Sequence, residues 1–214
     1  GHSTLVRPYP ISVAFDSSDK KTVPELRKDI AREGILKDLG IYADYIGVGV
    51  DRIDYTKGIP ERFISIGRFF EKYPDFVGKF TFIELGAPSR THIKRYHDLI
   101  AELDELSDKI NWRYKTKTWK PIVFLKAHHG HQAISRHYRG SDVCIVSSLH
   151  DGMNLVAKEF VASRDDNDGV LILSQFAGAA RELNDAIIIN PYDIEATADA
   201  IYLALTMNST DRSE

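Results

Sequence analysis

The sequence has little cysteine, almost no net charge and no long apolar run. Cys144 is the only cysteine among 214 residues, so no disulfide can form within the chain, which favours a reducing, cytoplasmic location. The 28 Lys and Arg residues nearly balance the 31 Asp and Glu residues, so the net charge of -3 excludes a general attraction to nucleic acid or to an anionic membrane. No stretch has the length of a membrane span, and no secretory signal pattern opens the chain.

What the chain does contain is enough apolar material for a core. Hydrophobic residues make up 43% of the sequence, which excludes a disordered chain and fits one large α/β domain. Cys144 itself stands in the apolar run 143–146. We therefore expect it to be a buried strand residue and not a catalytic thiol.

Short runs rich in β-branched residues alternate with longer amphipathic segments. This pattern predicts a Rossmann-like, doubly wound α/β fold with a mainly parallel sheet and helices on both faces. Strands are expected at 45–50, 80–85, 122–125, 143–148, 170–174 and 186–190. Helices are expected from Pro60 to just before Pro74, over 89–110, up to Gly140, and after Asp193, which suits an N-cap.

The first twenty residues differ from the rest of the chain. Prolines and a polar cluster at 16–19 indicate an incoming connection followed by a linker over 1–20. We expect residues 21–214 to form a single α/β domain.

Cations follow the first predicted strand. In an open parallel sheet, ligands bind beyond the carboxyl ends of the strands. Arg52, Lys57 and Gly58 lie there, just before a predicted helix start, which suits a diphosphate. The alternative is a solvated loop with an internal pair such as Arg52 with Asp54.

A second loop, 149–159, follows the predicted strand through Ser148. Asp151 can accept hydrogen bonds from sugar hydroxyls, while the free backbone N–H groups of residues 152–155 can point at an anion. Glu159 lies one or two turns into the helix, on a face that could reach a ribose. The alternative is that Asp151 merely caps the helix and Glu159 is a surface carboxylate.

Four segments together resemble the donor-site signatures of the trehalose-6-phosphate synthase family. They are DRIDYTKGIPERF at 51–63, DGMNLVAKEFV at 151–161, LSQFAGAA at 173–180 and NPYD at 190–193. The resemblance extends from Tyr9 to Met207. It implies a two-domain glycosyltransferase-B fold, of which this chain is the C-terminal, donor-binding domain, with the N-terminal acceptor domain absent from the chain.

The resemblance also implies a role for each matching residue. Arg52 and Lys57 would hold the donor diphosphate and stabilise the leaving nucleotide, and Asp151 would bind hydroxyls of the transferred glucose. Glu159 would bind the ribose, and Arg90 would bind the phosphate of the acceptor. The remaining donor contacts would be the backbone of Gly152, Met153, Asn154, Leu155 and Val156, with Leu85 and Ile134 near the nucleobase and the backbone around His129 pairing with its edge.

The implied reaction transfers glucose from an NDP-glucose, expected to be UDP-glucose, to glucose 6-phosphate with retention at the anomeric carbon. The product is trehalose 6-phosphate, and no metal or other cofactor is required. The expected partners are the nucleotide sugar, the sugar phosphate and the enzyme's own N-terminal domain, without nucleic acid or membrane. Whether the full-length form is a homo-oligomer stays open.

One stretch departs from the family pattern. Bacterial members have an arginine where this chain has His131, which leaves the base and acceptor preference open. His128, His131 and His137 could instead be read as a metal site. We disfavour that reading because no Asp, Glu or Cys stands at ligand spacing from them.

Three further functions compete with this assignment. Two are related transferases, a glucosylglycerol-phosphate synthase with another acceptor and a pseudoglycosyltransferase that uses a cyclitol. The third is a non-catalytic, nucleotide-sugar-binding regulatory module. A nicotinamide-dependent dehydrogenase is disfavoured because no Gly-x-Gly-x-x-Gly turn follows the first strand.

Overall fold

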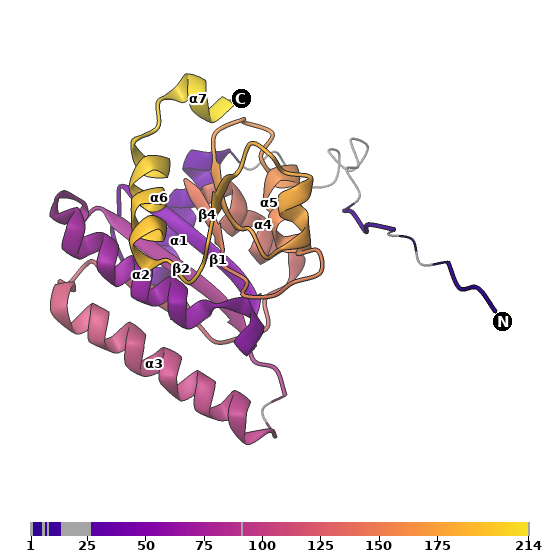
Figure 1. Ribbon diagram of the computed structural model, residues 1–214. Helices are drawn as coiled ribbons and strands as arrows, with labels where there is room; N and C mark the ends of the chain where they lie inside the picture. Colours follow the sequence, from indigo (N-terminus) through magenta and orange to yellow (C-terminus); the bar gives the residue numbers. More distant parts are fainter. Residues whose placement is uncertain (1, 6, 8, 14–26, 91, 214) are drawn as a thin grey trace.

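The computed structural model describes residues 2–5, 7, 9–13, 27–90 and 92–213 (Figure 1). The predicted boundary between a linker and the domain at residue 20 lies outside the described residues. From Lys28 onward, helices and strands alternate along the chain as the sequence pattern predicts.

A six-stranded sheet forms the centre of the domain, and all of its strands are parallel. The strands are β1 (Tyr45–Arg52), β2 (Phe80–Ala87), β3 (Ile122–Leu125), β4 (Val143–Val146), β5 (Val170–Ser174) and β6 (Ile187–Ile189). Their order is β3-β2-β1-β4-β5-β6, so the chain winds outward from β1 to β3 and then returns to β4. The direction of winding thus reverses between β1 and β4, where open parallel sheets bind ligands.

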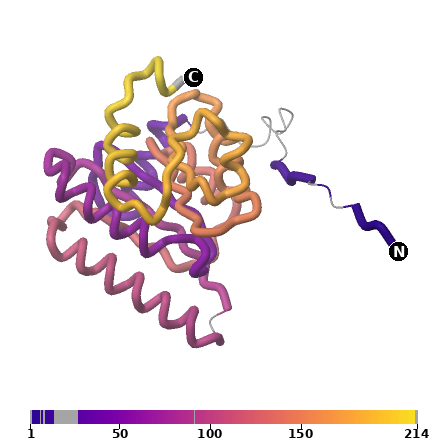
Figure 2. The backbone as a smooth tube through the Cα atoms, in the orientation of Figure 1, coloured from indigo at the N-terminus to yellow at the C-terminus, as the bar shows by residue number. Residues whose placement is uncertain are grey.

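Helices cover both faces of the sheet, which confirms the doubly wound prediction. On one face lie α2 (Ile59–Lys72), α3 (Lys94–Tyr114) and α6 (Ile194–Thr206), and the smooth trace in Figure 2 shows them side by side. The other face carries α1 (Lys28–Leu39), α4 (His131–Gly140) and α5 (Leu155–Ser163). Short helical turns complete the structure at η2 (Tyr55–Lys57), η3 (Pro74–Phe76), η4 (Gly178–Arg181) and α7 (Ser209–Ser213).

The element boundaries follow the prediction closely, apart from shifts of a few residues at several ends and one helix that was not predicted. β3 and β5 have the predicted bounds, whereas β1 and β2 each continue two residues further and β4 ends two residues earlier. α3 begins at Lys94 and not at residue 89. α1 was not predicted, because it buries little more than Ala31 and Ile35 and has a glycine, Gly34, in its middle. The structure explains this glycine, since a Cβ there would lie 2.4 Å from Arg136 Nη2.

The predicted end of one helix, the predicted start of another and the predicted burial of Cys144 are confirmed. α4 ends at Gly140, and the Asp193 side chain caps α6 by accepting a hydrogen bond from the backbone N–H of Ala196 (2.9 Å). Cys144 is completely buried in β4, and burial raises the pKa of its thiol. A catalytic thiolate at this position is therefore excluded on physical grounds.

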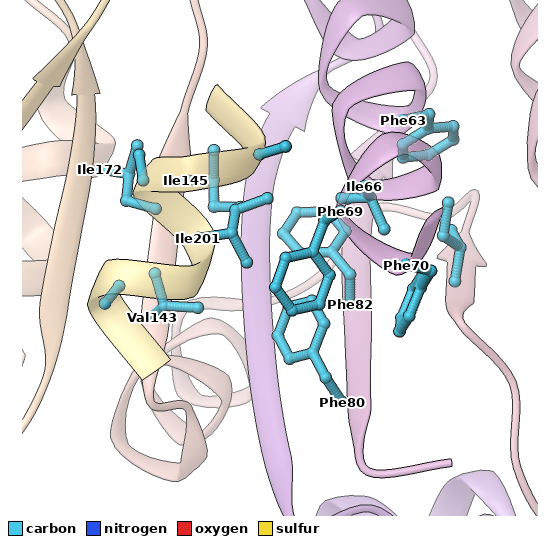
Figure 3. Packing of buried hydrophobic residues seen from close by; sticks show 14 of the residues in the cluster. Phe63, Ile66, Phe69, Phe70, Phe80, Phe82, Val143, Ile145, Ile172 and Ile201 are labelled. Carbon is cyan, nitrogen blue, oxygen red and sulfur yellow. The ribbon is translucent and has the colours of Figure 1, made fainter. Parts of the chain in front are cut away.

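The core beneath α2 and α6 is rich in aromatic and branched side chains. Figure 3 shows phenylalanines of α2 and β2 packed together, with Ile201 of α6 beside the isoleucines of β4 and β5. Phe69 lies with its ring centroid 5.5 Å from that of Phe80, in an edge-to-face arrangement. This packing fixes the position of α2, whose first turn directly follows the first loop of the candidate site.

Two isoleucines of α2 allow a matched test of this core. Ile66 is fully buried, whereas Ile64 is 44% exposed on the same helix. We expect Ile66→Ala to lower the free energy of unfolding by about 2–5 kcal/mol, because it removes packed methyl groups and leaves a cavity. Ile64→Ala should lower it by less than about 1 kcal/mol. Urea denaturation followed by circular dichroism measures both, and equal losses would contradict the described packing.

Candidate functional site

Three loops meet at the carboxyl edge of the sheet, beside the point where the strand order reverses. They follow β1, β4 and β5, and backbone hydrogen bonds join them. The N–H of Leu149 donates to Thr56 O (2.8 Å), which connects the first loop to the second. The N–H of Gly178 donates to Asp151 O (3.0 Å), and that of Ala179 to Met153 O (2.7 Å), which connects the second loop to the third.

Two glycines permit this close approach of backbone to backbone. Gly58 has a left-handed φ of 63°, and a Cβ there would lie 2.2 Å from Ser147 O. A Cβ on Gly178 would lie 2.0 Å from Gly152 O. Both positions therefore exclude any side chain, and the three loops form one surface with fixed geometry.

An ion pair between Lys57 and Asp151 joins the first and second loops. Lys57 Nζ lies 2.6 Å from Asp151 Oδ2, and the two side chains are only 16% and 17% exposed. Asp151 also accepts from the Asn154 amide (3.1 Å). Burial alone would raise the pKa of Asp151, but Lys57, together with hydrogen bonds from Asn154 and the N–H of Met153, outweighs it and holds the pKa below its usual value, so the carboxylate stays ionised.

The residue that caps α5 is Asn154 and not Asp151. The Asn154 side chain accepts from the backbone N–H of Ala157 (3.0 Å), so the alternative in which Asp151 merely caps the helix is wrong. Asn154 has a φ of 77°, a strained conformation that Asn tolerates better than most residues. Because the cap satisfies the N–H of Ala157, the N–H groups at Leu155 and Val156 remain suited to an anion.

Arg52 and Lys57 differ in their surroundings. Arg52 ends β1 with an exposed side chain, and among the described residues it forms neither a hydrogen bond nor an ion pair. The alternative pair with Asp54 is not formed, since Asp54 instead caps η2 by accepting from the N–H of Thr56 (3.0 Å). The structure thus brings Lys57 to Asp151 and leaves Arg52 on the open rim.

Arg90 is connected to the first loop through Tyr96, a residue that the sequence analysis did not assign to the site. Arg90 is exposed, with a φ of 47°, and its Nη1 donates to Tyr96 Oη (3.0 Å). The Tyr96 hydroxyl donates in turn to Asp54 Oδ2 (3.2 Å). Helical spacing over residues 94–114 predicts that Tyr96 faces inward but does not connect it with the site.

The residues expected around the nucleoside come from β2, from α4 and the loop before it, and from α5. Glu159 accepts a hydrogen bond from the Tyr138 hydroxyl (3.3 Å). Leu85 is almost fully buried and Ile134 partly so, and both belong to one hydrophobic cluster. His129 is half-buried, and its Nε2 is buried without a hydrogen-bond partner among the described residues. Leu85 thus presents little surface to a ligand, while His129 retains an unused polar atom.

A cleft of about 890 Å³ opens beside the second and third loops. Asp151 and Gly152 of the second loop, Phe176 of the third loop and a segment that includes Ile11 line it. The buried Lys158 of α5 donates to Ile11 O (2.9 Å). The volume suits a ligand of nucleotide-sugar size.

The alternative of a metal site gains no support. The described part of the chain contains no group of three or more His, Cys, Asp or Glu side chains placed to hold a metal ion. His137 Nδ1 lies 2.8 Å from Ala133 O on its own helix.

No helix among the described residues has the length and apolarity needed to cross a bilayer.

A buried charged cluster lies directly under the first loop. Arg62 of α2 contacts both Glu84 of β2 (2.6 Å) and Asp51 of β1 (2.8 Å), and all three side chains are buried. Burial raises the pKa of Glu84 to about 7, although Arg62 opposes the shift. Glu84 Oε1 has no hydrogen-bond partner among the described residues.

This fold and site define a Rossmann-like α/β domain of the kind that forms half of a GT-B glycosyltransferase. The chain belongs to glycosyltransferase family 20, whose model matches residues 1–214. It is 37% identical over 213 residues to a UDP-forming α,α-trehalose-phosphate synthase of Schizosaccharomyces pombe. The aligned region covers 99% of this chain and 41% of that protein. The chain therefore spans less than half the length of this relative.

Solved structures give the same result. A UDP-forming α,α-trehalose-phosphate synthase from Burkholderia xenovorans in complex with glucose-6-phosphate superposes with a TM-score of 0.87 at 35% identity, covering 96% of this chain and 44% of that one. A trehalose-6-phosphate structure from E. coli bound with UDP-2-fluoro glucose superposes with a TM-score of 0.85 at 39% identity, covering 96% and 45%.

The buried Glu84 predicts a pH-dependent stability. Its pKa is about 7 in the folded protein against a usual 4.5. Between these values the native state retains a proton that the unfolded chain has lost, so the free energy of unfolding falls as the pH rises. From pH 5 to pH 8 we expect wild type to lose on the order of 1–3 kcal/mol relative to Glu84→Gln.

Urea denaturation at both pH values measures this difference. Glu71→Gln is the control, because hydrogen bonds from Arg113 and Arg68 lower the pKa of Glu71, which is then ionised over the whole range. The difference between wild type and the control variant should stay constant. A constant difference for Glu84→Gln as well would show that Glu84 does not take up a proton on folding in this range.

Proposed function

We propose that this chain is the donor-binding half of a retaining glycosyltransferase that moves glucose from UDP-glucose to glucose 6-phosphate and forms trehalose 6-phosphate. The observation that carries the proposal is the Lys57–Asp151 pair beside the start of α5. It puts a cation for phosphate and a carboxylate for sugar hydroxyls next to each other at the edge where parallel sheets bind ligands.

The chemistry follows from charge. As the glucosyl bond to the nucleotide breaks, negative charge grows on the departing β-phosphate and the sugar gains oxocarbenium character. In the proposal, Arg52 and Lys57 bind that phosphate together with the free N–H groups at Leu155 and Val156. Fixed donors stabilise the developing charge more than the ground state, because they need no reorganisation during the reaction.

Asp151 has a second role in this proposal. Its carboxylate is kept ionised by Lys57, so it can accept hydrogen bonds from hydroxyls of the transferred glucose. The contact between Asp151 and Lys57 also sets the distance between the sugar and the diphosphate. Glu159 binds the ribose, and the nucleobase rests near Ile134 and the backbone around His129.

Two relatives support the choice of substrates. The E. coli structure holds UDP-2-fluoro glucose, and the Burkholderia xenovorans structure holds glucose-6-phosphate. Arg90, exposed beside the first loop, is assigned to the phosphate of glucose 6-phosphate. Because both relatives are more than twice the length of this chain, we expect the chain alone to bind the donor without turnover.

Removal of either cation should weaken diphosphate binding. We expect Arg52→Ala and Lys57→Ala each to reduce the affinity for UDP by about 1–3 kcal/mol, the range for hydrogen bonds to charged groups. Isothermal titration calorimetry of the folded chain with UDP measures the loss. Arg68→Ala and Lys72→Ala are the controls, since these residues lie along α2 in ion pairs with Glu195 and should leave the affinity unchanged. Equal affinities in all five proteins would remove the assignment of both cations.

The nucleotide preference is tested separately. We expect UDP to bind more tightly than ADP or GDP in the same titration, with no release of UDP from UDP-glucose when glucose 6-phosphate is added to this chain alone. Absence of heat with every diphosphate, on a protein with a cooperative unfolding transition, would contradict the donor-binding proposal. Tighter binding of ADP or GDP would change the assignment of the donor nucleotide but not the assignment of the diphosphate site.

A further inference from the structure

Arg62 is a buried arginine that the proposed chemistry does not use. Its guanidinium makes three hydrogen bonds, from Nη1 to Glu84 Oε2 (2.6 Å), from Nη2 to Asp51 Oδ2 (2.8 Å) and from Nε to Ser147 Oγ (2.9 Å). The partners belong to β2, to β1 and to the residue just beyond β4. A single side chain thus connects three adjacent strands below the site.

The sheet is shaped to admit this side chain. Gly49 of β1 lies under the cluster, and a Cβ there would come within 2.3 Å of both Arg62 Nη1 and Glu84 Oε2. Burial of charged groups is costly, and apolar residues of similar volume often stabilise a fold at least as well. Stability alone is therefore a weak reason for the cluster, which points to a geometric role.

That role is visible in what Arg62 contacts at each end of the first loop. Asp51 is the next-to-last residue of β1, just before the loop. At its other end the Ser147 hydroxyl, which accepts from Arg62, donates to Gly58 O (2.8 Å) and lies 3.3 Å from Lys57 O. Arg62 thus holds both ends of the loop that carries Arg52 and Lys57.

We propose that Arg62 is a positioning residue for diphosphate binding, acting through Ser147 and Asp51 to hold the Lys57–Gly58 turn against the end of β4. This inference rests on the proposed function, because it assumes that Lys57 binds the diphosphate. The turn directs the Lys57 ammonium to Asp151, 2.6 Å away. If the turn loosens, Lys57 occupies that position for less of the time and the apparent affinity falls in proportion.

The charge state of Arg62 supports this role. Burial would lower its pKa, but Glu84 and Asp51 raise it above the usual value. The guanidinium therefore stays protonated, with all three of its hydrogen-bonded nitrogens acting as donors.

Ser147→Ala is the variant that tests the proposal. Arg62→Ala would leave two buried carboxylates without their partner, which threatens folding itself. Loss of the Ser147 hydroxyl removes the hydrogen bond from Arg62 Nε and the contacts with Gly58 O and Lys57 O, while both ion pairs of Arg62 remain. We expect the affinity for UDP to fall about 3- to 10-fold, the effect of one net hydrogen bond, while the affinity for uridine changes less than about twofold. NMR titration of the chain with each compound measures both dissociation constants.

The comparison of UDP with uridine separates positioning from general damage, because a distorted fold would weaken both. Ser65→Ala is the matched control: Ser65 is fully buried on α2, and its hydroxyl donates to Glu61 O on its own helix (2.8 Å). It should lose stability without changing the ratio of the two affinities. Ser147→Cys, with a side chain of similar size and a weaker donor, should give an intermediate ratio and serves if Ser147→Ala does not fold.

The outcomes are distinct. A UDP-to-uridine ratio that is unchanged in the folded Ser147 variants, with wild type binding UDP, overturns the positioning role and leaves the proposed function intact. If that unchanged ratio comes from equal losses of both affinities, the hydroxyl has a purely structural role. Failure of wild type to bind UDP overturns the proposed function, and the inference with it.

Discussion

The contact between the Lys57–Gly58 turn and the end of β4 is the constraint on which the site depends. A side chain at residue 58 would collide with the Ser147 carbonyl, so only a glycine in a left-handed conformation lets the two loops meet. Their meeting brings Lys57 to Asp151 across 94 residues of sequence. The backbone, more than any side chain, thus determines where the ion pair forms.

The parallel sheet makes this contact available. β1 and β4 are neighbours although β2 and β3 lie between them in the sequence, because the winding reverses after β3. The loops that follow β1 and β4 therefore emerge side by side with no helix between them. The third loop joins the same edge through the glycine at residue 178, whose N–H bonds to Asp151 O.

Charge is used locally in a chain that is almost neutral as a whole. Exposed pairs such as Arg68 with Glu195 contribute little to stability, since water screens them. The buried groups act differently. Lys57 keeps Asp151 ionised, and Arg62 with its two carboxylates fixes backbone segments whose relative positions the apolar core alone would leave less defined.

Much of the fold could be predicted from the sequence, because apolar, β-branched runs locate all six strands and the alternation with amphipathic segments gives the class. The rule that parallel sheets bind at their carboxyl ends is enough to select both candidate loops. The helix around Gly34 escaped prediction, since its apolar stripe is weak. Asn154 escaped as a cap because its role depends on an unusual backbone conformation.

Long-range pairing is what sequence patterns cannot supply. Nothing local to Lys57 indicates Asp151 as its partner, and the roles of Arg52 and of the nucleoside contacts remain predictions.

Arg62 would be expected on the solvent side of an amphipathic helix. A signal for its burial did exist, because Glu84 stands in an otherwise apolar strand and Gly49 in the strand beside it. A carboxylate in such surroundings requires a cationic partner.

The hydrogen bond from Lys158 to Ile11 O has a mechanical consequence. It reaches a backbone carbonyl, so it holds the segment around residue 11 whatever side chain stands there. Lys158 also pairs with Glu182 of the third loop (2.8 Å), so one side chain of α5 connects the Ile11 carbonyl to a loop that lines the cleft. A displacement of either the Ile11 segment or the third loop would therefore act on the other through Lys158.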